Sequence, residues 1–390
     1  MRRLLFSIYA LILVDEVLLL ALVPLAPTYR DELGLSKTET GALLGASGFA
    51  TVFISIPAGI LADRIGARRL TIAAGFLLAL AGLVQGLADE FWLLIGARIA
   101  FGAASATIWT AGSAWLSDSV PARRRSAALG AIMAVAGIGT MIGPVFAGFL
   151  AEHAGLGAPF YAAAAAAAAV TVGLVFSGPG RSAAHGHQPI LETVRAVRGE
   201  RLVLGALAVM VVCGLSDGVV ALLAPLQLDH NGISPGAIGA VFSIGAAVYL
   251  VGSVVVTRLG DRAARLGIAG AGALTLALSF LPVLVSSSTA AIVTVVLLRA
   301  PSVALLYTIC FPLGANGAHR AGVGRGAAIG LLNVGWGSAS LVAPLAAGAV
   351  AQVSSERIAY AAFVALALAA GAWLVALRAR TAVPDPHVGG

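Results

Sequence analysis

The chain has 390 residues, of which 59% are hydrophobic and 11% are charged. A soluble globular protein carries about 25% charged residues, so this composition, with a mean hydropathy of +0.99, predicts a surface that largely faces lipid. The two cysteines, Cys213 and Cys310, lie in apolar runs and exclude a disulfide scaffold. The net charge of +7 comes from short arginine clusters between apolar segments, so we expect no nucleic-acid-binding domain.

Twelve continuous apolar runs follow one another along the chain. A helix needs about 20 apolar residues to cross a hydrocarbon core of roughly 30 Å. The runs therefore predict an all-α polytopic membrane protein with spans at 4–26, 40–61, 70–88, 92–116, 127–150, 158–177, 202–226, 236–257, 267–285, 290–313, 326–350 and 358–377. The apolar residues do not alternate with polar ones, which argues against a transmembrane β-barrel.

The spans form two sets of six. We expect an N-terminal six-helix bundle at 1–177, a cytoplasmic central linker at 178–201, a C-terminal six-helix bundle at 202–380 and a cytoplasmic tail at 381–390. The first span follows two arginines, as a signal peptide does. Because Asp15 and Glu16 interrupt its apolar run and no small-residue cleavage site is visible, we expect this span to be retained.

The basic residues are distributed unequally between the two sides of the predicted membrane. If the N-terminus is cytoplasmic, nineteen of the 24 Lys and Arg residues lie on the cytoplasmic side and only Arg30, Lys37 and Arg357 lie outside. Such a bias sets the orientation of membrane proteins. It predicts a multi-pass protein of the cell (inner, cytoplasmic) membrane with both termini in the cytoplasm.

The two halves of the chain repeat each other at an offset of about 200 residues. The matching positions are Asp15 with Asp217, Asp63-Arg64 with Asp261-Arg262, Arg98 with Arg299, and Gly130, Pro144 and Gly148 with Gly330, Pro344 and Gly348. Many secondary transporters are built from repeats of this kind, with the substrate site near the membrane midplane between them. The repeat predicts two pseudo-symmetric bundles around a central site.

Several motifs resemble those of the major facilitator superfamily, and the resemblance covers nearly the whole chain. The run GILADRIGARR at 59–69 is similar to the signature loop between spans 2 and 3, and Arg98 followed by Gly102 is similar to the span 4 motif. The first span resembles that of vesicular amine transporters and their bacterial drug-exporting relatives. The resemblance implies the major facilitator fold and a 12-span drug:proton antiporter.

The fifth span resembles the motif of proton-coupled drug antiporters, with Ala147 in place of a glycine. Its motif residues are Gly130, Gly139, Gly143, Pro144 and Gly148. Gly139 and Gly143 are about 40° apart around a helix, whereas Gly130, Gly137 and Gly148 lie on the opposite side. Small residues allow close approach between membrane helices. We expect this helix to lie between two neighbours, the alternative being ordinary membrane packing.

The loop after the second span combines small residues with charge. Gly59 allows close helix approach and Gly66 a tight reversal, and in the resembled family the acidic residue of this loop, here Asp63, contacts span 11. Asp118 is a candidate partner for Arg64, Arg68 or the arginines at 123–125. We expect the residues Gly59, Asp63, Arg64, Gly66, Arg68 and Asp118 to form a conformational latch. The alternative is that the arginines only set the topology.

Five charged residues lie inside the predicted spans, namely Asp15, Glu16, Arg98, Asp217 and Arg299. A charge at the bilayer centre costs at least about 2.5–3.5 kcal/mol, so these side chains are paired, hydrated or functional. Asp15–Arg98 and Asp217–Arg299 ion pairs are the structural alternative. The functional one is that a carboxylate in a low-dielectric cavity binds a proton and releases it when a cation approaches. Which of Asp15 and Glu16 faces the cavity is left open.

Other polar and aromatic residues are candidates for lining the cavity. They are Trp109, Tyr249, Tyr307, Asn333 and Trp336. Aromatic residues in membrane helices also serve as packing and interface anchors. Asn333 stands where the resembled amine transporters carry an acid. The chain shows no metal-ligand cluster and no phosphate-binding loop, so we expect no cofactor, no enzyme activity and a proton gradient as the energy source.

Together these features predict a proton-coupled antiporter that exports small hydrophobic or cationic compounds by alternating access. The expected partners are a small-molecule substrate and the lipid bilayer, without nucleic acid or nucleotide, and the expected working unit is a monomer. One alternative is a proton-coupled symporter for a sugar or other metabolite. Another is a receptor on the same scaffold that transports nothing.

Overall fold

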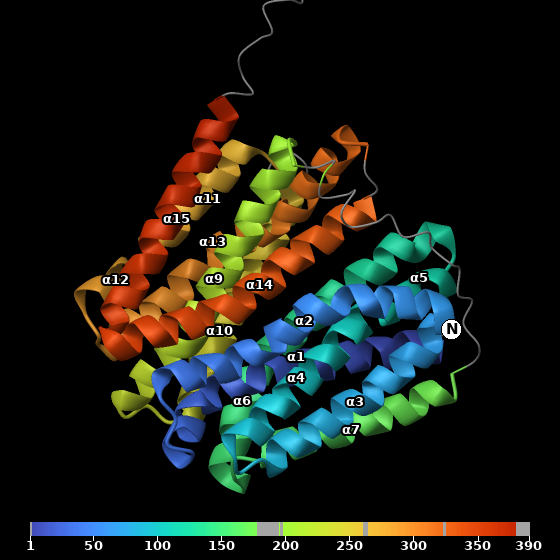
Figure 1. Ribbon diagram of the computed structural model, residues 1–390, viewed down its shortest axis with the longest axis horizontal. Coiled ribbons are helices and arrows are strands. Elements are labelled where there is room, and N and C mark those ends of the chain that lie inside the picture. Colours follow the sequence, from blue (N-terminus) through green and yellow to red (C-terminus); the bar gives the residue numbers. More distant parts are fainter. Residues whose placement is uncertain (1, 178–194, 196–197, 260–263, 323–324, 380–390) are drawn as a thin grey trace, which may run out of the picture.

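The computed structural model describes residues 2–177, 195, 198–259, 264–322 and 325–379 (Figure 1). Within these ranges the regular structure is entirely helical. Twelve helical segments are long and apolar enough to cross a membrane, which confirms the predicted number of spans. Most of the expected linker, the tail and the repeat of the signature loop at Asp261-Arg262 lie outside the described residues, so the domain boundaries stay a prediction.

The N-terminal half contributes six spans. Five are single helices: α1 (Arg2–Glu32), α2 (Lys37–Ile65), α3 (Ala67–Leu87), α6 (Arg125–Ala154) and α7 (Ala158–Val175). The fourth span is composite, because α4 (Phe91–Thr107) continues through a π-helical turn, η1 (Ile108–Gly112), into α5 (Ser113–Ser119). A short 3₁₀ turn, η2 (Ala122–Arg124), leads into α6.

The C-terminal half repeats this order. Its single helices are α9 (Arg201–His230), α10 (Pro235–Leu259), α13 (Thr289–Arg320), α14 (Arg325–Val353) and α15 (Glu356–Ala379). The ninth span is divided into α11 (Leu266–Leu278) and α12 (Leu281–Val285). Several helices extend beyond the predicted spans, as α1 does by continuing past Pro24 and Pro27 to Glu32. Hydropathy marks the apolar part of a helix and not its full length.

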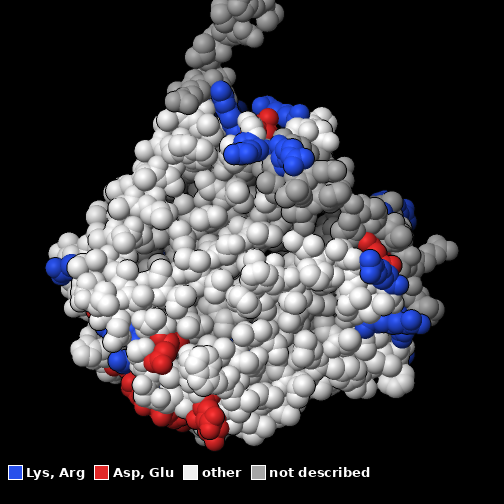
Figure 2. Space-filling model, viewed as in Figure 1, with Lys and Arg blue, Asp and Glu red and all other residues white. Residues whose placement is uncertain are grey.

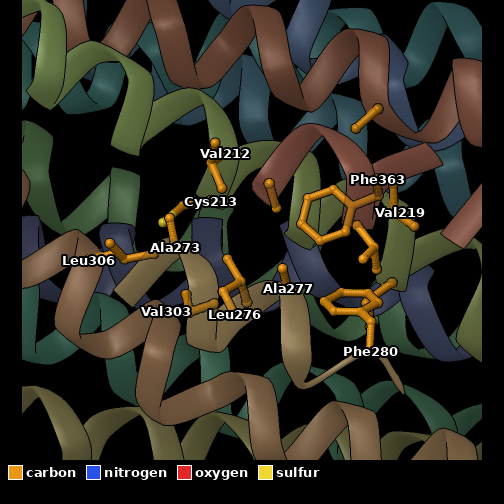
Figure 3. Packing of buried hydrophobic residues seen from close by; sticks show 14 of the residues in the cluster. Val212, Cys213, Val219, Ala273, Leu276, Ala277, Phe280, Val303, Leu306 and Phe363 are labelled. Carbon is orange, nitrogen blue, oxygen red and sulfur yellow. The ribbon is translucent and has the colours of Figure 1, made fainter. Parts of the chain in front are cut away.

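Each half has its own large apolar core. One cluster of buried residues runs from Leu4 to Leu174 and the other from Ala206 to Leu374. Figure 3 shows the second, in which residues of α9, α11, α13 and α15 meet, and the rings of Phe280 and Phe363 lie 4.7 Å apart between centroids. Both cysteines are buried and free, as predicted. The chain therefore forms two bundles of six spans.

The two bundles meet mainly through two pairs of helices, α2 with α14 and α6 with α10. We call the end of the molecule with the start of α1 and the end of α15 the terminal end, and the end with the turns at 33–36 and 231–234 the distal end. In the distal half of α2, a Cβ at Gly45 would lie 2.6 Å from the carbonyl oxygen of Leu341. Near the terminal end, Gly130 and Gly330 have no such neighbour within 4 Å. The bundles accordingly spread apart toward the terminal end (Figure 1).

The helix α6 lies between α1 and α10. On one face, a Cβ at Gly139 would lie 2.6 Å from the Cβ of Glu16, and one at Gly143 would lie 3.1 Å from the Cα of Val17. On the other face, a Cβ at Gly137 would clash with Leu250 and one at Gly148 would clash with Pro235, both on α10. The expected two-sided packing is present for these four glycines. Gly130 does not take part in it.

Charge is segregated along the molecule. On the face shown in Figure 2, Lys and Arg gather at the terminal end, Asp and Glu concentrate toward the distal end, and a broad uncharged band separates them. Such a band is the surface expected to face lipid. The segregation fits the charge bias in the sequence.

Candidate functional site

Asp15 is at the centre of the N-terminal bundle and has no exposed surface. Its Oδ2 accepts hydrogen bonds from Ser105 Oγ at 2.9 Å and from Trp109 Nε1 at 3.0 Å. Its Oδ1 is buried and has no hydrogen-bond partner among the described residues. A buried polar atom left in this state is costly. This oxygen can therefore bind a proton or accept a hydrogen bond from a further donor.

The π-helical turn η1 carries Trp109. Single π turns inside helices are rare and are frequent at functional sites. Ser105 lies four residues before Trp109, so the two donors share the helix face that meets α1. Ser105 was not predicted from the sequence, although a polar residue four positions before a candidate tryptophan in an apolar span was a usable signal. The sequence offered no sign of the π turn.

Arg98 is also buried, with 1% of its surface exposed, but among the described residues it forms no ion pair with Asp15. Its guanidinium donates to Ser47 Oγ at 3.3 Å and to the carbonyl oxygen of Leu18 at 3.5 Å. The guanidinium carbon also lies 4.9 Å from the centroid of the Phe101 ring. The structural Asp15–Arg98 pair is therefore absent, because other groups hold the arginine.

The second aspartate has different partners. Asp217 Oδ1 pairs with Arg299 at 2.6 Å, and Asp217 Oδ2 accepts a hydrogen bond from Tyr307 at 2.9 Å. The Tyr307 hydroxyl in turn accepts from Trp336 Nε1 at 3.1 Å, and its ring stands edge-on to that of Tyr249 at 6.4 Å. The predicted Asp217–Arg299 pair is present. Helices α9, α10, α13 and α14 thus bring together five of the residues singled out from the sequence.

Glu16 faces away from Asp15. Its Oε2 accepts from Thr140 Oγ1 on α6 at 3.3 Å, whereas Asp15 contacts α4 and η1. The two carboxylates therefore serve different helix interfaces. Asn333 is exposed on α14 and takes no part in the hydrogen-bond network of Asp217.

The expected latch residues lie around the turn between α2 and α3 and, for Asp118, in α5. Gly66 has a φ of 94° and links α2 directly to α3, as its predicted role in a tight reversal requires. Arg68 instead donates to the carbonyl oxygens of Val175 at 2.7 Å and Ser177 at 3.4 Å, at the end of α7. Gly59 is buried, Arg64 is exposed, and Asp63 and Asp118 are half-buried. Arg68 therefore caps a helix of its own bundle.

The family model described as Major Facilitator Superfamily matches residues 5–324 and, a second time, 209–389. The chain belongs to the major facilitator superfamily. It is a multi-pass membrane transporter of that family. The second match falls on the C-terminal half, where the sequence repeat lies.

Several relatives are bacterial resistance proteins. Over 255 residues the chain is 27% identical to Multidrug resistance protein 2 of Bacillus subtilis (strain 168), covering 62% of this chain and 64% of that protein. It is 28% identical to Quinolone resistance protein NorA of Staphylococcus aureus (strain N315) over 37% of each chain. It is 32% identical to MFS-type transporter ppzB of Metarhizium rileyi over 37% of this chain and 31% of that protein. These matches span less than two thirds of each relative.

A solved structure has the same fold. It is a bacterial homologue of the human lysosomal transporter Spinster in an inward-facing and unoccupied conformation, similar to this chain with a TM-score of 0.78 over 96% of both chains. At 15% sequence identity the likeness concerns the fold alone.

Proposed function

We propose that this transporter is a proton-coupled antiporter that exports small hydrophobic or cationic compounds. The observation that carries the proposal is Asp15, a buried carboxyl group that has one unpartnered oxygen and no bonded cation among the described residues. Burial without a charge partner favours the neutral form of a carboxylic acid. When water or a cation reaches the site, the ionised form becomes favourable. Asp15 can thus take up a proton in one state of the transporter and release it in another.

The Asp217 network supplies a second element, suited to binding a cation. The Asp217 side chain is 39% exposed although it lies mid-span, and a charged group at that depth is expected to face a water-filled cavity. Tyr249, Tyr307 and Trp336 place aromatic rings beside it. A lipophilic cation would compete with Arg299 for the carboxylate and stack on these rings. We therefore assign Asp217 to substrate binding and Asp15 to proton binding.

Alternating access is supported by the shape of the interface. The glycine-rich contacts of α2 with α14 and of α6 with α10 hold the distal end together, while the terminal end is spread. Rocking of one bundle against the other around a midplane site would reverse this arrangement. The arginines at the terminal end support a cytoplasmic location for that end, and the structure would then be open to the cytoplasm. The names of the resistance-protein relatives support export as the direction.

The test uses purified protein in liposomes with an imposed pH gradient and a trapped pH dye. We expect tetraphenylphosphonium or a lipophilic antibiotic to dissipate the gradient, and Asp15→Asn to reduce this exchange at least about 100-fold, in the range of lost proton transfer. Asp31→Asn is the matched control, because Asp31 is an exposed aspartate outside the bundle core. Full pH-driven exchange by Asp15→Asn would remove Asp15 from the mechanism. A sugar that moves in the same direction as protons would make the protein a symporter.

A further inference from the structure

A basic cavity of about 790 Å³ opens at the terminal end of the C-terminal bundle, away from both aspartates. It lies between α9, α11, α13 and α15. Its polar lining consists of Asn316, His319 and three arginines, Arg265, Arg320 and Arg378. Among the described residues that line it, none is acidic. Three guanidinium groups around one cavity provide the charge that an anion requires.

The chemistry of the cavity favours an anion in two further ways. Arg265 and Arg320 are exposed, and among the described residues neither forms an ion pair. The start of α11 also lines the cavity, and no side chain of the described residues caps it. Uncapped N–H groups at a helix N-terminus bind anions. The carboxylate of the neighbouring acid Glu200 accepts a hydrogen bond from the backbone N–H of Leu202 at 3.2 Å and caps α9.

A second, apolar cavity of about 340 Å³ continues from the first. The two share Arg265, Gly267 and Arg378. From there the second cavity follows α11 past Ala271 and Thr275 toward the middle of the span, with α13 on its other side. A free phosphate ion would fill only the basic part. The pair of cavities fits a molecule with an anionic head and an apolar chain.

The corresponding place in the N-terminal bundle is occupied by the protein itself. Helix α3 begins at Ala67 and its repeat α11 begins at Leu266, so the first turns of the two helices can be compared. Arg68 reaches the last carbonyl groups of α7. At Gly267 there is no side chain, and a Cβ there would lie 2.7 Å from Cδ of Arg378. In the C-terminal bundle the arginine comes from α15 instead, and the space beside it remains a cavity.

We propose that this cavity binds the phosphate headgroup of an anionic phospholipid, with an acyl chain along the groove between α11 and α13. Basic pockets between membrane helices at the level of the headgroups bind such lipids. The site is independent of the transport cycle proposed above. It would tie the C-terminal bundle to lipids of one leaflet.

The test is native mass spectrometry of the full-length protein titrated with dioleoylphosphatidylglycerol, with dioleoylphosphatidylcholine as the neutral lipid. We expect one tightly bound phosphatidylglycerol, whose dissociation constant rises about thirtyfold in Arg265→Gln/Arg320→Gln, since each basic residue contributes about 1 kcal/mol. The matched control is Arg3→Gln/Arg69→Gln, which removes two exposed arginines from the other bundle at the same end.

The groove is tested separately. Ala271→Trp fills it and should weaken phosphatidylglycerol binding about tenfold, whereas Ala162→Trp, at an exposed position on α7, should not. If inorganic phosphate displaces the lipid and Ala271→Trp has no effect, the site binds a free anion and the lipid assignment is wrong. Equal losses in the two double arginine variants would show general electrostatic attraction and would overturn the site itself.

Discussion

The two aspartates occupy equivalent positions in the repeat and have different surroundings. Asp217 has an arginine at 2.6 Å and a tyrosine at 2.9 Å, whereas the described partners of Asp15 are a serine and a tryptophan, both on one oxygen. The equivalent arginines are both present, so they do not explain the difference. It arises from their neighbours, because Ser105, Ala106 and Trp109 in the first copy correspond to Leu306, Tyr307 and Cys310 in the second. Duplication kept the charges and substitution of nearby residues changed their partners.

The interface between the bundles, by contrast, kept its symmetry. A Cβ at Gly41 on α2 would clash with the carbonyl of Pro344, and a Cβ at Gly239 on α10 would clash with that of Pro144. Gln352 accepts from the backbone N–H of Lys37 at 3.0 Å, and its repeat partner Glu152 accepts from that of Gly236 at 2.8 Å. Close backbone packing tolerates little change, so this part of the repeat is preserved. The interface between the bundles is symmetric, and the surroundings of the two aspartates inside them are not.

Among the tests of this comparison, we expect the largest effect on transport from the symmetric interface. Gly41→Leu and Gly239→Leu should each reduce exchange at least about tenfold, because overpacking a close contact costs about 1–3 kcal/mol. Both should also lower disulfide cross-linking of Lys37→Cys with Glu356→Cys, which replaces an ion pair between the bundles. Gly96→Leu, with no neighbour within 4 Å of its Cβ, is the control. Unequal losses for the two glycines would show that the interface is not functionally symmetric.

A smaller effect is expected from the two arginines. Arg299→Met should lower the free energy of unfolding by about 2 kcal/mol, less than for a fully buried pair because Asp217 is partly exposed. Arg98→Met should change it by less than about 1 kcal/mol, since a buried charge with weak partners is replaced by an apolar chain. Thermal unfolding in detergent measures both. An Arg98→Met loss as large as that of Arg299→Met would contradict the different pairing of the two aspartates.

Two tryptophans that donate hydrogen bonds in the two networks, Trp109 and Trp336, sharpen the comparison further. Trp109→Phe removes a donor to a carboxyl group and should cost about 1.5 kcal/mol, whereas Trp336→Phe removes a donor to a neutral hydroxyl and should cost about 0.5–1 kcal/mol. Both replacements keep an aromatic ring, so packing changes are similar. Chemical unfolding of the two variants decides the order. The reverse order would place the stronger hydrogen bond in the Asp217 network.

The smallest effect is expected at the end of α7. Arg68→Gln should lower the free energy of unfolding by about 0.5–1 kcal/mol, because a cation at a helix C-terminus is lost. The adjacent exposed Arg69 offers the control, and Arg69→Gln should have no measurable effect on thermal unfolding. Identical results for both variants would mean that the cap contributes nothing to stability.

Much of the fold followed from local composition. The twelve spans and the two-bundle architecture were predicted, since a continuous apolar run of about 20 residues has few other stable states in a membrane. Glycine spacing around a helix also predicted that α6 has two packed faces. Gly130 was predicted to lie on a packed face, but a Cβ there would have no neighbour within 4 Å. The spacing of residues gives their direction around one helix but does not show where adjacent helices diverge.

The sequence alone determined the number of spans, the repeat and which charged residues lie mid-span, because these depend on the order of residue types. Only the tertiary structure decided that Asp15 forms no ion pair with any described residue, that Glu16 faces α6 and that Arg68 caps α7. Each of these depends on distances of a few ångströms between helices far apart in the chain. A long side chain such as arginine reaches several alternative acceptors, and packing selects one of them.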